Sequence, residues 1–197
     1  MDGNGVSGAA SFRLVEQAKA GRLDAVEALY REHAERIYGY LSASVGNPED
    51  AEDLTIQTFV RMIESLERFE ARSTPFAAWL YRIARNLAID HFRATVRART
   101  RTARLAAAEG RAASAEEQAL VDLERQGVRD QIASLPLPQR EVLTLKFVCG
   151  LSNAETAVVL DKTEGAVKAL QHRALVTLQQ RASVAAIRSQ EAGGSRR

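Results

Sequence analysis

The chain has 197 residues, enough for one domain or two small ones, and its 46% hydrophobic and 26% charged residues are typical of a folded protein. Its formal net charge of +2 indicates no particular partner. The single cysteine, Cys149, excludes an intramolecular disulfide, and no Cys or His spacing fits a metal site. No apolar run is long enough to span a membrane, and the N-terminus lacks a basic-then-apolar signal. We therefore expect a cytoplasmic chain with no cofactor, no metal and no membrane insertion.

Helix is expected almost throughout, because Ala, Leu, Arg and Glu dominate and β-type alternation is absent. We predict an all-α protein of two small helical domains joined by a flexible basic linker, the second domain being a helix-turn-helix. Residues 1–11 and 185–197 are expected to be disordered tails, since both are rich in small and polar residues. Between them we place a first domain at 12–96, the linker at 97–119 and the second domain at 120–184.

A clear helix start lies at Asn47 and Pro48, where an Asn side chain can cap free amides and Pro needs none. The predicted helix, 48–69, is acidic, with seven acids against two arginines between Glu49 and Glu70. Its packing face holds Ala51, Leu54, Phe59, Met62 and Leu66. Its other face carries Asp53, Gln57, Arg61 and Glu64, and also Ile56 and Val60. Exposed aliphatic side chains among acids favour a protein interface over a solvated face.

After a break at 72–75, the stretch WLYRIARNLAIDHFR (79–93) predicts a helix with two unlike faces. The apolar stripe holds Leu80, Ile83, Ala84 and Leu87. The opposite side is almost entirely cationic, with Arg82, Arg85, Asn86, Ile89 and Arg93, and with Trp79 at its flank. A solvated face usually mixes both signs of charge, so the pattern alone leaves open what this face contacts. His91 falls on the apolar stripe and is interpreted as a core histidine.

The linker 97–119 is rich in Arg and Ala and poor in large apolar residues, and part of it can be helical. Between Arg93 and Arg111 there are six arginines and one acid, Glu109. Such a segment fits either a phosphate-lined path or a solvated tether.

The second domain is interrupted by LPLP at 135–138 and then carries a sharper pattern. Ser152 and Glu155 form a capping box that starts one helix, which ends near Leu160. A short turn follows, and Thr163 can cap a second helix, which is the spacing of a helix-turn-helix.

On this second helix the predicted inward face holds Val167, Leu170, Ala174 and Leu178. The outward face holds Lys168, Ala169, His172, Arg173 and Val176. In helix-turn-helix proteins such a face enters the DNA major groove, where Lys and Arg meet phosphates or guanine edges. The spacing alone also fits an ordinary helical hairpin with a solvated face.

Three stretches, taken in this order, resemble a bacterial RNA polymerase sigma factor of the sigma-70 family. They are DAEDLTIQTFVR (50–61), FEARSTPFAAWLYRIARNLAIDHFR (69–93) and LPLPQREVLTLKFVCGLSNAETAVVLDKTEGAVKALQHRAL (135–175). More narrowly, the chain is similar to the small extracytoplasmic-function group, which keeps two of the family's domains. The resemblance covers about residues 12–184.

The resemblance implies a protein that binds RNA polymerase core and directs it to promoters. The N-terminal domain would melt and read the −10 element, and the C-terminal domain would read the −35 element. The implied partners are promoter DNA, the coiled coil of the largest polymerase subunit, the polymerase flap and an anti-sigma factor. Neither domain would be an enzyme.

The resemblance also implies roles for particular residues. The helix 48–69 would dock on the polymerase, and the matching contacts are Asp50, Asp53, Ile56, Gln57, Val60 and Arg61. The loop 69–76 and the following helix would bind the −10 region through Phe69, Phe76, Trp79, Arg82, Arg85, Asn86 and Arg93. A base flipped from the non-template strand would sit there against Asn86. Phe69 and Phe76 fit a core role as well, and Trp79 also fits a hydrophobic cap.

For the −35 element the matching residues are Lys168, His172 and Arg173, with Lys146 over the phosphate backbone. Lys146 fits a solvated surface lysine equally well. The linker arginines Arg97, Arg99, Arg101 and Arg104 match the family's connector toward the RNA exit channel.

Two departures from the family pattern stand out. Ile56 and Gln57 replace the usual Gln-Glu pair, and Ala169 and Leu170 replace a frequent Ser-Arg pair, which leaves the −35 sequence open. The alternatives are a stand-alone helix-turn-helix regulator and a hydrolase or transferase. The regulator would need a ligand or dimerisation domain, and the enzyme would need a nucleophile elbow, a phosphate loop or a catalytic His arrangement; the sequence shows none of these.

Overall fold

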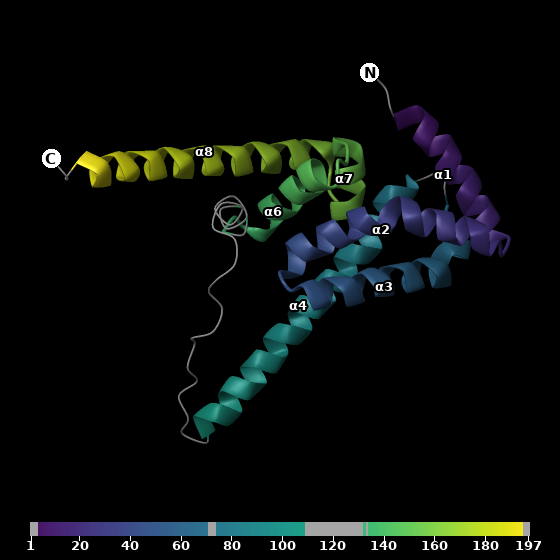
Figure 1. Cartoon of the computed structure of the whole chain (residues 1–197), viewed down its shortest axis with the longest axis horizontal. Helices are drawn as coiled ribbons and strands as arrows, with labels where there is room; N and C mark the ends of the chain where they lie inside the picture. Colours follow the sequence, from purple (N-terminus) through teal and green to yellow (C-terminus); the bar gives the residue numbers. More distant parts are fainter. Residues whose placement is uncertain (1–3, 71–73, 109–131, 133, 195–197) are drawn as a thin grey trace. The chain divides into compact units, whose positions relative to one another are not determined.

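The computed structural model describes residues 4–70, 74–108, 132 and 134–194 (Figure 1). The described residues form helices and their connecting turns, without a strand. The chain divides into two compact units, an N-terminal one with α1 to α4 and a C-terminal one with α6 to α8. The prediction of an all-α fold is confirmed. No described helix is long and apolar enough to cross a membrane.

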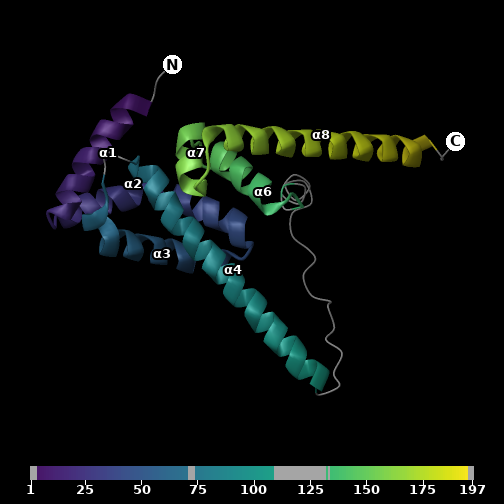
Figure 2. The same cartoon turned by 180° about the vertical axis from the view of Figure 1, so that it is seen from behind.

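The N-terminal unit is built from four helices and one short 3-10 turn. These are α1 (Asn4–Lys19), α2 (Leu23–Val45), α3 (Pro48–Ser65), η1 (Leu66–Arg68) and α4 (Phe76–Ala108). α2 contacts α1, α3 and α4, and α3 also contacts α4, so α2 and α3 form the centre of the unit (Figure 2).

The corner between α2 and α3 follows the predicted signals. α2 ends at Gly46, whose φ of 77° lies in the left-handed region that glycine adopts without strain. The Asn47 side chain then accepts a hydrogen bond from the amide of Glu49 at 2.9 Å, and Pro48 occupies the first turn. The predicted helix start is confirmed.

The core of this unit is formed by large side chains from all four helices. Val15, Leu29, Leu41, Met62 and Leu80 are completely buried. The predicted packing face of α3 is confirmed, because Ala51, Leu54, Phe59, Met62 and Leu66 are all buried.

The C-terminal unit contains α6 (Leu137–Leu143), a π-helical turn η2 (Thr144–Val148), α7 (Asn153–Leu160) and α8 (Glu164–Gly194). α6 packs on α8, where Leu135, Leu143, Ala174 and Leu178 form an apolar cluster. The LPLP motif acts as a helix start: Pro136 has an extended backbone (φ −52°, ψ 139°), and Pro138 lies in the first turn, where its missing amide costs nothing.

Three helices extend into segments that the sequence predicted as tails or linker. α1 starts at Asn4 inside the expected N-terminal tail, α4 continues to Ala108 through the first half of the expected linker, and α8 continues to Gly194. Extending an existing helix adds one hydrogen bond per residue fixed, whereas starting one is costly, so Ala-rich flanks join helices that the core has already nucleated. The rest of the expected linker, 109–119, and the start of the second domain lie outside the described residues.

Candidate nucleic-acid and protein interfaces

The helix-turn-helix forms as its capping residues predict. The amide of Ser152 donates to Glu155 Oε2 at 2.8 Å, and the amide of Glu155 donates to Ser152 Oγ at 3.1 Å. This reciprocal pair is a capping box. At the turn Asp161 adopts a left-handed conformation with φ 52°, and Thr163 Oγ1 then accepts from the amide of Ala166 at 3.2 Å.

α8 presents the predicted faces. Val167 and Ala174 are fully buried, and Leu170 and Leu178 are partly buried. Lys168, His172 and Arg173 are exposed on the opposite side. The Arg173 guanidinium donates to the carbonyl of Ala169 at 3.3 Å, which holds the side chain back along the helix. The fold therefore presents all three predicted −35 contacts on one exposed face.

Lys146 lies in the π-helical turn η2 rather than in a regular helix. The amide of Cys149 donates to the carbonyl of Thr144 at 3.1 Å, one residue wider than an α-helical bond. Gly150, with φ 70°, closes the turn. Lys146 is half-buried, while the neighbouring Phe147 and Val148 are exposed. The exposure of Phe147 and Val148 was not predicted from the sequence; Gly150 signals only where the helix ends.

The outward face of α3 carries an exposed aliphatic stripe. Ile56 and Val60 are 60% and 48% exposed, which confirms that both point away from the core. Ile63, 54% exposed, extends the stripe by another turn and was not predicted. Asp53 and Gln57 are exposed beside it, and Arg61 forms an ion pair with Glu64 at 2.9 Å.

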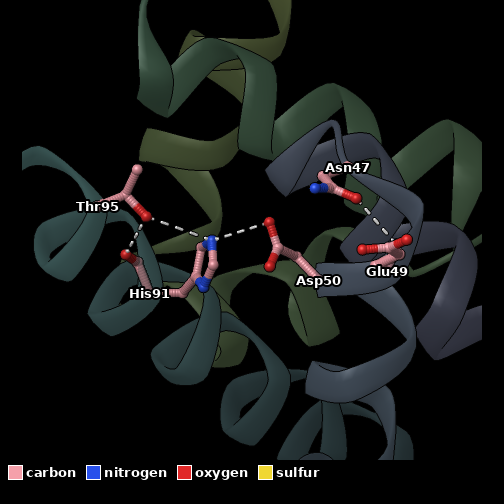
Figure 3. Close-up of polar contacts among 5 residues, drawn as sticks. All are labelled: Asn47, Glu49, Asp50, His91 and Thr95. Atoms are coloured by element: carbon pink, nitrogen blue, oxygen red, sulfur yellow. Dashed lines mark hydrogen bonds and ion pairs between the residues drawn. The ribbon is translucent and has the colours of Figure 1, made fainter. Parts of the chain in front are cut away.

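Asp50 differs from the other predicted polymerase contacts, because it is half-buried and turned toward α4. Its Oδ2 lies 3.4 Å from His91 Nε2, and Thr95 Oγ1 donates to the carbonyl of His91 at 3.0 Å (Figure 3). His91 has polar partners within the chain, as expected of a satisfied histidine, but it is not in the core, because its side chain is 29% exposed. The pair joins the first turn of α3 to α4.

α4 presents the predicted cationic face, but Trp79 is not part of that face. Arg82, Asn86 and Arg93 are exposed, and Arg85 is half-buried. Trp79 is only 8% exposed, so the prediction that it lies at the flank of this face was wrong.

Trp79 instead packs in a cluster with Phe69 and Phe76, which are also buried. Its ring centroid lies 4.7 Å from that of Phe69 and 5.7 Å from that of Phe76, and the two Phe rings are 5.7 Å apart. The Lys19 ammonium donates to the carbonyl of Phe69 at 2.6 Å and so joins α1 to this cluster. The amphipathic pattern of α4 alone predicted Trp79 at the edge of the cationic face. The burial of three large rings against one another stabilises the buried position instead.

His33 packs against the same cluster, 5.3 Å from the ring of Phe76. Burial lowers the pKa of His33. The nearby charge of Glu32 raises this pKa in part, and the charge of Arg36 lowers it further. Its Nε2 has no hydrogen-bond partner among the described residues, because Glu32 Oε1 is 3.9 Å away. Among the described residues there is no group of three or more His, Cys, Asp or Glu placed to hold a metal ion.

Comparison with known proteins agrees with this division into units. The family description "Sigma-70 region 2" matches residues 29–98, and "Sigma-70, region 4" matches residues 125–178. The chain is 40% identical to the ECF RNA polymerase sigma factor BldN of Streptomyces coelicolor, over 85% of this chain and 64% of that protein. It is 33% identical to the ECF RNA polymerase sigma factor SigD of Mycobacterium tuberculosis, over 84% of this chain and 80% of that one.

Among solved structures, the chain is similar to CnrH in complex with the cytosolic domain of CnrY. The TM-score is 0.66 at 26% identity, and the match covers 87% of this chain and 96% of that one.

Proposed function

The chain belongs to the extracytoplasmic-function group of the sigma-70 family, and on that premise we propose that it binds RNA polymerase core and directs it to promoters with its own −35 and −10 elements. The observation that carries this proposal is the exposed stripe Ile56–Val60–Ile63 in a chain that also presents an exposed cationic helix-turn-helix face. A stand-alone regulator needs only the second feature. The polymerase would perform the chemistry, in the cytoplasm.

The stripe on α3 is proposed to dock on the coiled coil of the largest polymerase subunit. Its three aliphatic side chains recur at intervals of four and three residues, the spacing at which a helix packs against another helix. Ile56 stands where the family usually has a polar residue, so apolar burial would take a larger share of this contact. Asp53, Gln57 and Arg61 would supply the polar rim. Asp50 would act indirectly, by fixing the first turn of α3 against His91.

The exposed face of α4 is proposed to bind the −10 region. Arg82 and Arg93 are placed to contact phosphates, which makes this contribution sensitive to salt. The exposed amide of Asn86 offers both a donor and an acceptor to the edge of a flipped base. Trp79, Phe69 and Phe76 would support this site from beneath, since their rings are buried in the free chain.

The −35 element is proposed to be read by α8 through Lys168, His172 and Arg173, with the half-buried Lys146 in a supporting phosphate contact. The half-buried Arg85 belongs to the −10 face of α4. An anti-sigma factor is the proposed inhibitor. Two faces are available for it to cover, the stripe on α3 and the exposed face of α8.

Co-purification with core polymerase tests the proposal. Core enzyme from Streptomyces coelicolor, the source of the 40%-identical relative, should co-elute with the chain. Ile56→Asp should abolish co-elution, whereas the matched control Leu23→Asp should not, since both residues are exposed aliphatics of the same unit. Failure of the unmodified chain to bind core, or equal behaviour of the two variants, would contradict the proposed docking.

A further inference from the structure

α1 reaches the end of the α3–η1 segment through one charged side chain, Lys19. Its ammonium donates to the carbonyl of Phe69 at 2.6 Å, lies 3.6 Å from Glu16 Oε1 and is 6.0 Å from the centre of the Phe69 ring. α1 also contacts η1. This helix precedes residues 29–98, which match the sigma-70 region 2 description, so the match assigns no role to Lys19.

The Phe69 carbonyl lies where the helical backbone ends. The amide of Phe69 still donates to the carbonyl of Leu66 at 3.0 Å, but the backbone of Phe69 is extended, with φ −73° and ψ 126°, so the helix does not continue past it. Carbonyls at a helix C-terminus lack donors within the helix and carry the negative end of its dipole. A lysine ammonium is favourable at this point, and here it comes from a different helix.

The packing of α1 fixes the position of Lys19. Val15 and Ala18 are buried, and Lys19 follows them by one turn and by one residue, so it lies on the side of α1 that faces the rest of the unit. The chain turns directly afterwards at Gly21, with φ 80°, whose amide donates to the carbonyl of Ala18 at 3.0 Å. The Lys19 side chain is 23% exposed. Lys19 is therefore a fixed point for the Phe69 backbone and not a solvated lysine.

The Phe69 ring connects this contact to the exposed face of α4. Phe69 packs on Trp79, which lies about two turns before Asn86, so the Trp79 and Asn86 side chains leave α4 on the same side. The cluster of Phe69, Phe76 and Trp79 thus covers the N-terminal end of the side that carries Asn86. A shift of the Phe69 backbone would displace the rings that hold this end of α4.

We propose that Lys19 is a positioning residue for −10 recognition and touches no DNA itself. By fixing the Phe69 carbonyl, it keeps the Phe69 ring against Trp79 and holds the Asn86 side of α4 in the orientation that reads a base. The inference rests on the proposed function, because it assigns to α1 the support of the proposed −10 face. A lysine that only stabilised the fold would affect all promoters equally, since a loss of folded chain lowers every rate by the same factor.

Transcription by core polymerase with the full chain, from promoters that differ at single −10 or −35 positions, separates these two roles. Lys19→Met removes the charge and the donor but keeps the apolar stem. It should reduce discrimination about 2- to 30-fold at the −10 position that Asn86→Ala also relaxes, and leave −35 discrimination and core affinity unchanged. Lys19→Arg should restore the discrimination, because its guanidinium keeps both the charge and the donors.

Val15→Ala is the matched control, because it destabilises the same helix and leaves the Lys19 hydrogen bond in place. It should lower transcription from every promoter by one factor without changing base preference. In the double variant, Lys19→Met should add nothing to the relaxation caused by Asn86→Ala. If Lys19→Met melts below the assay temperature, Lys19→Gln replaces it with the same expected result, since its side chain is neutral.

Unchanged −10 discrimination in the folded Lys19→Met protein would overturn the proposal. An equal loss of discrimination in Val15→Ala, or at the −35 positions, would overturn it as well and leave Lys19 with a role in stability alone. Failure of the proposed function is distinguishable, since the unmodified chain would then give no promoter-specific transcripts at all.

Discussion

Replacing Trp79 by Ala should unfold or severely weaken the N-terminal unit. The side chain is 8% exposed, and its ring lies 4.7 Å from Phe69 and 5.7 Å from Phe76. Removing a buried Trp costs about 3–5 kcal/mol, because the transfer energy of the ring is lost and a cavity remains. At about 4–8 °C per kcal/mol for a domain of this size, the midpoint of its thermal unfolding should fall by at least about 12 °C.

Circular dichroism during urea and thermal unfolding measures this effect. Trp79→Phe is the matched variant: it keeps one ring in the cluster and should cost roughly 1–2 kcal/mol, so that the unit stays folded. Transcription on a pre-melted promoter should then fail to rescue Trp79→Ala, because the defect is in folding. A folded Trp79→Ala protein within about 1 kcal/mol of the unmodified chain, rescued by pre-melted DNA, would refute the core assignment and place the ring against the opened strand.

Four further outcomes are expected. Val60→Asp should impair core binding in a pull-down while changing the unfolding free energy by less than about 1 kcal/mol, because the residue is already exposed. Lys168→Ala and Arg173→Ala should each lower promoter affinity in gel-shift titrations. If the residue reads a base, the loss should be roughly 1–3 kcal/mol and specificity should relax at that position. If it touches only phosphate, affinity should fall about equally on all sequences. Asn86→Ala should keep the unfolding free energy within about half a kcal/mol but lose base preference at one −10 position, measured by transcription from promoter variants. Burial holds the pKa of His33 below its ordinary value, so the unfolded chain binds a proton at this residue first as the pH falls. The free energy of unfolding should therefore decrease below about pH 6.5. His33→Gln should flatten that decrease, measured by urea titrations at several pH values.

The parts of the structure governed by local chemistry could be predicted from the sequence. The capping bonds follow the residue types. The Asn47 side chain accepts from the amide of Glu49, Ser152 and Glu155 form a reciprocal capping box, and Thr163 accepts from the amide of Ala166. The exposure of Ile56 and Val60 on α3 was also predicted, because a period of 3.6 residues places them on another face than buried Met62.

The remaining features depend on contacts between segments distant in the sequence. Trp79 is buried because Phe69, ten residues earlier, comes back against it, and a helical projection of α4 alone contains no such information. His91 lies on the predicted apolar stripe, yet its environment is set by Asp50 at the start of α3. The Ala-rich flanks show a third limit, since composition does not fix how far a nucleated helix extends.

Run-off transcription with a genomic promoter library tests most directly whether this chain turns core RNA polymerase into a promoter-specific enzyme. With core polymerase and the chain together, we predict transcripts whose templates share one −35 and one −10 element at fixed spacing, and none above background when either protein is omitted. A chain that binds duplex DNA by itself but gives core polymerase no new start sites would contradict the account and favour a stand-alone helix-turn-helix regulator.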